Sequence, residues 1–197
     1  MTRPLLYVKD ILPSLDPDLL ADGSVDDKVQ AGIDRLMSMQ TPSGGFGVWP
    51  GAHDPVLWGT AYVVHLMLDA KDAGYSVSER GLQDAIRWLD DNAESEPGGS
   101  KFRGTHPGYV QYVLSRAGRP HQASASKLLA EMDAAHPKGH GLDGRDAEGR
   151  YLLQAALWRA GDRRHEPALK AVDVSRIRKD RRNGWSYYSD LRRRGMS

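Results

Sequence analysis

Cysteine is absent from this chain of 197 residues, and its charge is close to balanced. Without a thiol, the sequence excludes a disulfide-stapled scaffold, a thiolate zinc site and a catalytic cysteine within the chain. The 27 basic and 26 acidic side chains leave a formal net charge of +1, which argues against nucleic-acid binding driven by bulk electrostatics. No stretch approaches the roughly 18 apolar residues of a membrane span. We therefore expect no nucleic-acid partner and no direct membrane contact.

Strand signals are also scarce, because no alternation of apolar and polar residues lasts long enough to predict a sheet. Helical spacing is frequent instead. Val29 and Ile33 belong to the apolar face of a helix expected after Ser24, with acidic residues in its first turn. A longer helix is expected over about 54–73, opened by Asp-Pro and closed by Gly74. The next helix is expected to open at Ser78–Arg80, and Asp69 and Asp72 are expected on the polar side of the longer one.

Glycine-rich loops recur about 40–55 residues apart, which indicates a repeat. The loops are Gly44–Gly47, Gly98–Phe102, Gly139–Leu142 and Asn183–Trp185. Each precedes an expected helix, and three of these helices end in Ala-Gly before a short turn and another helix, near Ser78, His121 and Arg164. Stacked helical hairpins would share one core. We predict about four hairpins, the last beginning with a helix at Trp185–Tyr188; an unrelated all-α bundle is the alternative.

The first glycine-rich loop carries the most informative motif. Its residues are Gln40, Gly44, Gly45, Phe46, Gly47 and Trp49. This pattern resembles the Gln…Gly-Gly-Phe-Gly…Trp motif of α/α-toroid proteins, which include protein prenyltransferases, triterpene cyclases and thioester domains. Glycines permit positive φ and close backbone approach, and Phe46 and Trp49 are expected to fill the gap between adjacent hairpins. The resemblance implies an all-α fold, an α/α toroid of helical hairpins, but no function.

The flanking residues narrow the resemblance to bacterial alpha-2-macroglobulins. Trp58 and Tyr62 stand in a segment similar to a Trp-Leu-Thr-Ala-Tyr helix of that family, although Gly59 replaces the leucine. Residues 72–77, 112–119 and 185–192 fit further family segments. Thr2–Val8 is similar to the stretch that follows the family's Cys-x-x-Gln thioester motif. The resemblance implies that residues 1–197 are a single fragment of a thioester-type toroid domain, an incomplete toroid lacking the thioester motif itself.

For the parent protein, the resemblance implies a protease inhibitor that traps attacking proteases. A thioester joins the cysteine sulfur to the glutamine side-chain carbonyl, and a lysine amine of the protease attacks it. The chain itself is then a scaffold, not an enzyme, without a cofactor. Its expected partners are proteases, through the parent, and other domains of the parent. The same resemblance implies a periplasmic location and a lipid anchor on the inner membrane.

Candidate chemical residues within the chain are few. In some relatives a histidine from a toroid loop helps the thioester to react, and His106 is the nearest candidate by position; an exposed residue at a helix start is the alternative. His65 is expected to be packed in the core. His136 and His140 could hold a metal only adventitiously, so we predict no metal site.

Two other functional classes stay open. One is an α/α-toroid enzyme of the terpene cyclase or glycosidase type, and the other is a non-catalytic helical interaction scaffold. Cyclases need an Asp-x-Asp-Asp acid motif, which Asp26-Asp27 and Asp16-Pro17-Asp18 do not match. The carboxylates of residues 90–96 are expected to be solvated.

Two further expectations concern surfaces. The basic residues between 176 and 194 are expected to form a solvated face or to contact another parent domain. An open toroid would leave apolar hairpin faces uncovered, which predicts self-association at high concentration.

Overall fold

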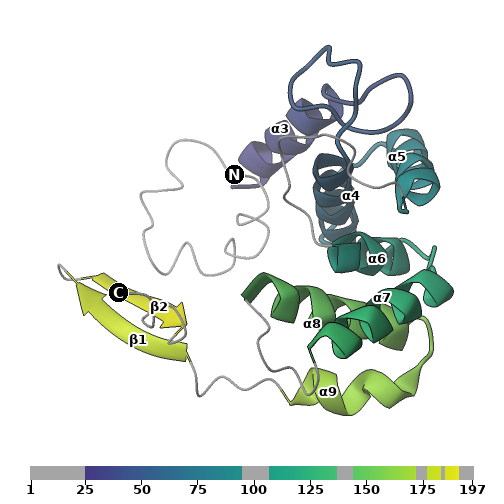
Figure 1. The fold of residues 1–197 in the computed structure, drawn as a ribbon. Helices are drawn as coiled ribbons and strands as arrows, with labels where there is room; N and C mark the ends of the chain where they lie inside the picture. The colour runs from purple at the N-terminus through teal and green to yellow at the C-terminus, as the bar shows by residue number, and fades with distance from the viewer. Residues whose placement is uncertain (1–24, 95–106, 137–143, 172–176, 183–184, 191–197) are drawn as a thin grey trace.

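The computed structural model describes residues 25–94, 107–136, 144–171, 177–182 and 185–190. Its helices are α3 (Val25–Met37), α4 (Leu57–Asp72), α5 (Glu79–Asn92), α6 (Pro107–Arg116), α7 (Gln122–Ala135), α8 (Gly144–Arg159), the 3₁₀ helix η3 (Arg163–His165) and α9 (Glu166–Lys170). Figure 1 shows α3, α4 and α5 in the upper half and α7, α8 and α9 in the lower half, with α6 between them. The predicted succession of helical hairpins is confirmed for the described residues up to Lys170.

The start of α4 differs from the prediction. Val56, not Asp54, is the residue before the first turn, and no side chain caps it. Val56 is extended, with φ −114° and ψ 126°, and its N–H donates to the Phe46 carbonyl at 2.9 Å. The residue before a proline disfavours helical backbone, which keeps Asp54 outside α4, and Pro55 also precedes the first helical residue, Leu57.

The other predicted boundaries agree better with the structure. The Ser78 hydroxyl accepts a hydrogen bond from the Gly81 N–H at 3.2 Å, so Ser78 caps α5 as expected. The glycines of the three Ala-Gly pairs all have positive φ, which ends each helix in the left-handed conformation. These glycines are Gly74, Gly118 and Gly161.

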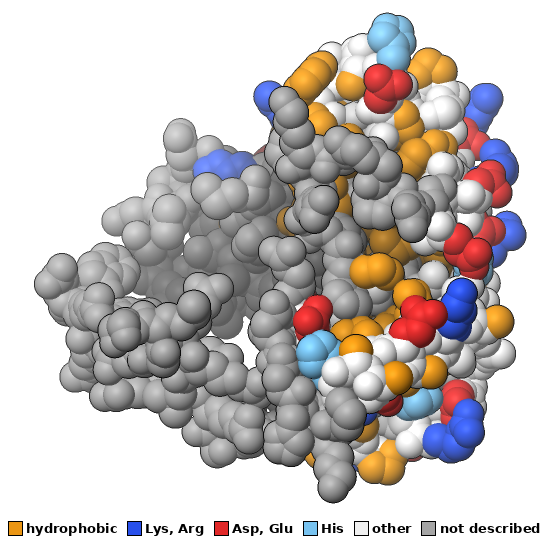
Figure 2. Space-filling view, viewed as in Figure 1, with side chains coloured by type: hydrophobic (Ala, Val, Ile, Leu, Met, Phe, Trp, Pro, Cys, Tyr) orange, Lys and Arg blue, Asp and Glu red, His pale blue; other side chains and the backbone are white. Residues whose placement is uncertain are grey.

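One apolar core joins α3, α4, α5, α6 and the first glycine-rich loop. Its fully buried members include Ile33, Phe46, Val64, Leu89 and Leu114. A second, smaller cluster lies between α7 and α8 and consists of Ala125, Leu129, Leu153 and Leu157. Charged side chains of both signs follow the outer edge near α5 and α7 (Figure 2).

The helix predicted at Trp185–Tyr188 is wrong. This segment belongs to β2 (Trp185–Asp190), which pairs antiparallel with β1 (Ile177–Arg182), and Arg182 lies opposite Trp185. The aromatic residues favour a strand, and the intervening sequence Asn183-Gly184 is the strongest short hairpin signal that a sequence carries. The spacing of the glycine-rich loops alone predicts a helical hairpin here, because it does not separate a hairpin of helices from a hairpin of strands.

Candidate functional site

The side chain of Gln40 holds the first glycine-rich loop in place through two hydrogen bonds. Its side-chain Nε2 donates to the Gly44 carbonyl at 2.8 Å and to the Gly81 carbonyl at 2.7 Å. Gln40 also forms an isolated antiparallel bridge with Phe46. One amide group therefore closes the loop on itself and attaches it to the first turn of α5.

Two glycines of this loop are required by close backbone approach. Gly44 has φ +98°, and a Cβ there would lie 2.7 Å from the backbone oxygen of Asp84. A Cβ on Gly45 would lie 2.5 Å from Pro55 Cβ and 2.7 Å from the Trp88 ring. No other residue type fits the loop at this distance from α5.

Phe46 and Trp49 have opposite environments. Phe46 is only 2% exposed, and its N–H donates to the Thr60 hydroxyl at 2.8 Å, which ties the loop to α4. Trp49 is 65% exposed, so the expectation that it fills the gap between hairpins is wrong. The Gly47 N–H donates to the Met39 carbonyl at 3.0 Å, and the turn beyond it carries Trp49 outward.

Trp58 and Tyr62 lie one turn apart on α4, and both are partly exposed. They therefore line the outer side of the helix, whereas the loop packs on its inner side through Thr60.

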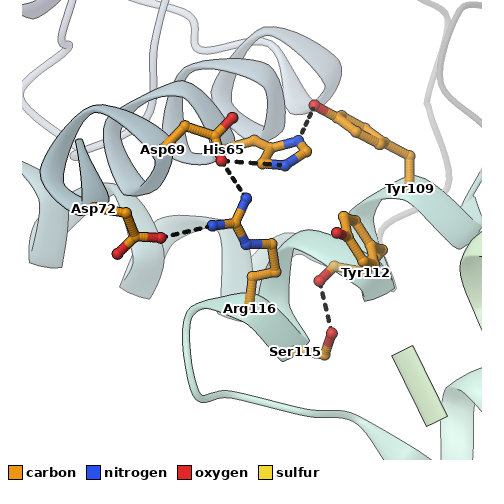
Figure 3. A network of polar contacts seen from close by, with 7 residues as sticks. All are labelled: His65, Asp69, Asp72, Tyr109, Tyr112, Ser115 and Arg116. Atoms are coloured by element: carbon orange, nitrogen blue, oxygen red, sulfur yellow. Dashed lines mark hydrogen bonds and ion pairs between the residues drawn. The ribbon is translucent and has the colours of Figure 1, made fainter. Parts of the chain in front are cut away.

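A polar network links α4 to α6 (Figure 3). His65 Nδ1 lies 3.0 Å from the Tyr109 hydroxyl, and His65 Nε2 lies 3.8 Å from Asp69 Oδ1. The Arg116 guanidinium donates to Asp69 and, at 3.0 Å, to Asp72. The prediction that His65 is a packed core residue is confirmed, since it is nearly fully buried. The prediction that Asp69 lies on the polar side of the helix is wrong.

Burial and charge act in opposite directions on Arg116. Burial disfavours the charged guanidinium, but the hydrogen bond to Asp69 and the negative charges of Asp69 and Asp72 outweigh it. The pKa of Arg116 is therefore raised, and the group stays charged. Asp69 can be buried because the guanidinium of Arg116, 47 residues later in the chain, lies against it and compensates its charge.

One aromatic contact and one hydrogen bond to the backbone complete the network. The Tyr112 ring meets the His65 ring edge-on at a centroid distance of 5.5 Å, and the Ser115 hydroxyl donates to the Tyr112 carbonyl at 2.7 Å. Because these groups are engaged with one another, the network suits an interhelical clamp rather than a nucleophile. The spacing of His65 and Asp69 by four residues was the one sequence signal for it.

Other predicted positions are spread over the molecule. His106 and His140 lie outside the described residues. The carboxylate of Asp90 was expected to be solvated, but it contacts His121 Nε2 at 2.6 Å and Arg119 at 3.7 Å. Glu94 accepts a hydrogen bond from Ser124.

The described part of the chain shows neither a metal centre nor a membrane helix. No group of three or more His, Cys, Asp or Glu side chains within it could hold a metal ion. None of its helices combines the length and the apolar character that a membrane crossing requires.

Residues 15–107 match the family model of the A-macroglobulin TED domain. The chain is 36% identical over 157 residues to an alpha-2-macroglobulin of Xylella fastidiosa, covering 74% of this chain and 9% of the relative. It is 40% identical over 67 residues to the alpha-2-macroglobulin of Escherichia coli K12, covering 32% of this chain and 4% of that protein. The aligned part of the chain thus spans less than a tenth of the length of each of these curated relatives.

Solved structures show the same fold. Trypsin-activated alpha-2-macroglobulin from Escherichia coli superposes with a TM-score of 0.62 at 23% identity, covering 86% of this chain and 12% of that one. The native Escherichia coli protein from domain MG7 to its C-terminus gives a TM-score of 0.59 at 23% identity, with 83% and 27% covered. These likenesses confirm the predicted toroid of helical hairpins, to which the β1–β2 pair adds two strands.

Proposed function

Because the chain belongs to the bacterial alpha-2-macroglobulin family, as a piece of its TED domain, we propose that it supports a thioester in a protein that traps attacking proteases. A thioester needs a cysteine thiol, and this sequence has none, so the reactive group comes from a segment outside these residues. The chain's own contribution is a scaffold: packed helical hairpins that hold a reactive acyl group away from water.

The observation that carries this proposal is the family match over residues 15–107, which contain the complete Gln40–Trp49 loop. The loop is attached to α5 by Gln40 and to α4 by Phe46, so it joins successive hairpins into one rigid unit. A rigid support fits the chemistry, because a thioester is an activated acyl donor that water destroys unless it is shielded.

The proposed trapping step is the aminolysis of a thioester, which needs no cofactor. A neutral lysine amine of the protease attacks the thioester carbonyl, the new C–N bond forms, and the C–S bond breaks. The proton that the nitrogen loses neutralises the departing thiolate. The products are an amide linking the two proteins and a free cysteine thiol.

The full-length parent protein tests this proposal. We expect that a protease that cleaves the parent becomes attached to it, giving a band on denaturing gels that resists reduction and boiling. Methylamine treatment beforehand should release one thiol for each chain and abolish the band. A parent that forms no such adduct and releases no thiol would contradict the proposal.

A toroid enzyme remains the competing class, and the carboxylates give it no support. Asp90 and Glu94 contact His121 and Ser124 rather than converging on a cavity. Incubation of the 197-residue chain with a cleaving protease is expected to give no adduct, because the chain carries no acyl donor of this kind.

We also propose that the parent is a periplasmic protein held at the inner membrane by a lipid anchor. The basis of this proposal is the resemblance to bacterial alpha-2-macroglobulins, which implies this location. Fractionation of cells expressing the tagged parent should recover it with inner membranes, released by detergent but not by salt. Recovery in the cytoplasmic fraction would contradict the proposal.

A further inference from the structure

A groove with an apolar floor and an acidic rim lies between α7 and α8, beside the start of α6. Its volume is about 260 Å³. One stripe of α7 forms the floor, because Leu128, Met132 and Ala135 recur at intervals of four and three residues. Leu128 and Met132 also pack on the small core between the two helices. The floor is therefore held by packed helices.

The rim is negatively charged. Glu131 of α7 and Asp146 of α8 both line the groove, and His136 Nε2 lies 4.0 Å from Asp146 Oδ2. No lysine or arginine stands among the described lining residues. Arg150, one turn beyond Asp146, is directed to Asp133 instead, at 2.7 Å. Figure 2 shows acidic and histidine side chains beside hydrophobic ones over this part of the molecule.

The size of the groove limits what it can hold. Pockets for small molecules measure about 300–1,000 Å³, so 260 Å³ suits one or two side chains of a protein segment better than a cofactor. An apolar floor under a carboxylate rim matches lysine and arginine, which lay their methylene stems on apolar surface and keep the charge at the polar edge. Charge complementarity of this kind selects a partner and orients it.

We propose that this groove docks a cationic amphipathic segment of a partner protein. A lysine or arginine stem lies over Leu128, Met132 and Ala135, and its charge reaches the carboxylates of Glu131 and Asp146. Each carboxylate can accept several hydrogen bonds, so Asp146 can bind a docked cation in addition to the contacts that it already makes. The proposal concerns a surface of this chain alone and does not depend on the trapping function.

The test titrates the 197-residue chain, labelled with ¹⁵N, with an acetylated and amidated peptide of sequence Leu-Lys-Leu-Leu-Lys-Leu. We expect amide shifts confined to α7, α8 and the start of α6. A peptide with glutamate for lysine should not bind. A peptide with serine for leucine should bind about tenfold more weakly, since it loses the apolar contact.

Variants of the chain sharpen the result. The double variant E131Q/D146N should bind the peptide about tenfold more weakly, whereas E148Q, an exposed carboxylate of α8 outside the groove, should bind as the wild type does. A135R places a cation in the groove from an exposed position and should abolish binding without disturbing the core. If the double variant unfolds, peptide binding by A135R alone tests whether the groove is the docking site. Wild-type affinity in A135R, or shifts located elsewhere, would overturn the proposal.

Discussion

Replacing Asp69 with asparagine tests whether its ion pair with Arg116 holds α4 against α6. The substitution keeps the size and the hydrogen-bonding oxygen of the side chain and removes the charge. The Asp69 side chain is 7% exposed and the Arg116 side chain 17%, so both charges have lost most of their hydration. In the variant, the partly buried guanidinium of Arg116 would keep its positive charge but lose the negative charge of its buried partner.

The size of the effect follows from this burial. Removing one partner of a buried pair costs about 3–5 kcal/mol. Arg116 keeps its bond to Asp72 at 3.0 Å, and the Asp72 side chain is 75% exposed, so water and a second carboxylate recover part of the loss. We expect D69N to lower the free energy of unfolding by about 2–3 kcal/mol. For a chain of this length, this corresponds to a fall in melting temperature of about 5–10 °C.

Urea unfolding followed by circular dichroism measures this difference, with D72N as the matched control. D72N removes an exposed partner of the same guanidinium and should cost no more than about 1 kcal/mol. The double variant D69N/R116M should be less destabilised than the sum of its single variants, because the unbalanced cation is gone. A D69N variant within about 0.5 kcal/mol of the wild type, or strict additivity in the double variant, would refute the reasoning.

Two further predictions concern the glycine loop and the pH dependence of stability. G44A should destabilise the chain by about 2–3 kcal/mol in urea unfolding, because the residue has φ +98° and its Cβ would meet the Asp84 backbone. G51A has φ +80° but open space, so it should cost about 1 kcal/mol, and equal losses would contradict the packing argument. Hydrogen bonds from Arg164 lower the pKa of Asp162 to about 2. Because the unfolded carboxyl has a pKa of about 3.9, its stabilisation is present above that pH and is lost as the pH falls through about 2. The stability difference between wild type and D162N should therefore be constant above about pH 5 and shrink below about pH 4, and a difference as large at pH 2 as at neutral pH would contradict the assignment.

Much of the fold could be predicted from local signals. Apolar spacing located the helices, Ser78 marked the start of α5, and the Ala-Gly pairs marked helix ends through glycines of positive φ. These features depend on residues close together in the chain, so a sequence shows them directly. The hairpin of Ile177–Asp190 also has a local signal, because Asn183-Gly184 is typical of a tight turn between two strands. The glycine spacing of the helical repeat predicts a helix at the same place, and that prediction is wrong.

The sequence by itself determined the helical repeat, the glycine loop with its buried Phe46, and the family to which these belong. Only the tertiary structure decided that Trp49 points outward and that Asp69 is buried. Burial of a carboxylate depends on a counter-ion, and Arg116 reaches Asp69 only when α6 packs against α4. The same applies to the groove between α7 and α8, whose apolar floor and acidic rim come from two helices that the folded chain brings side by side.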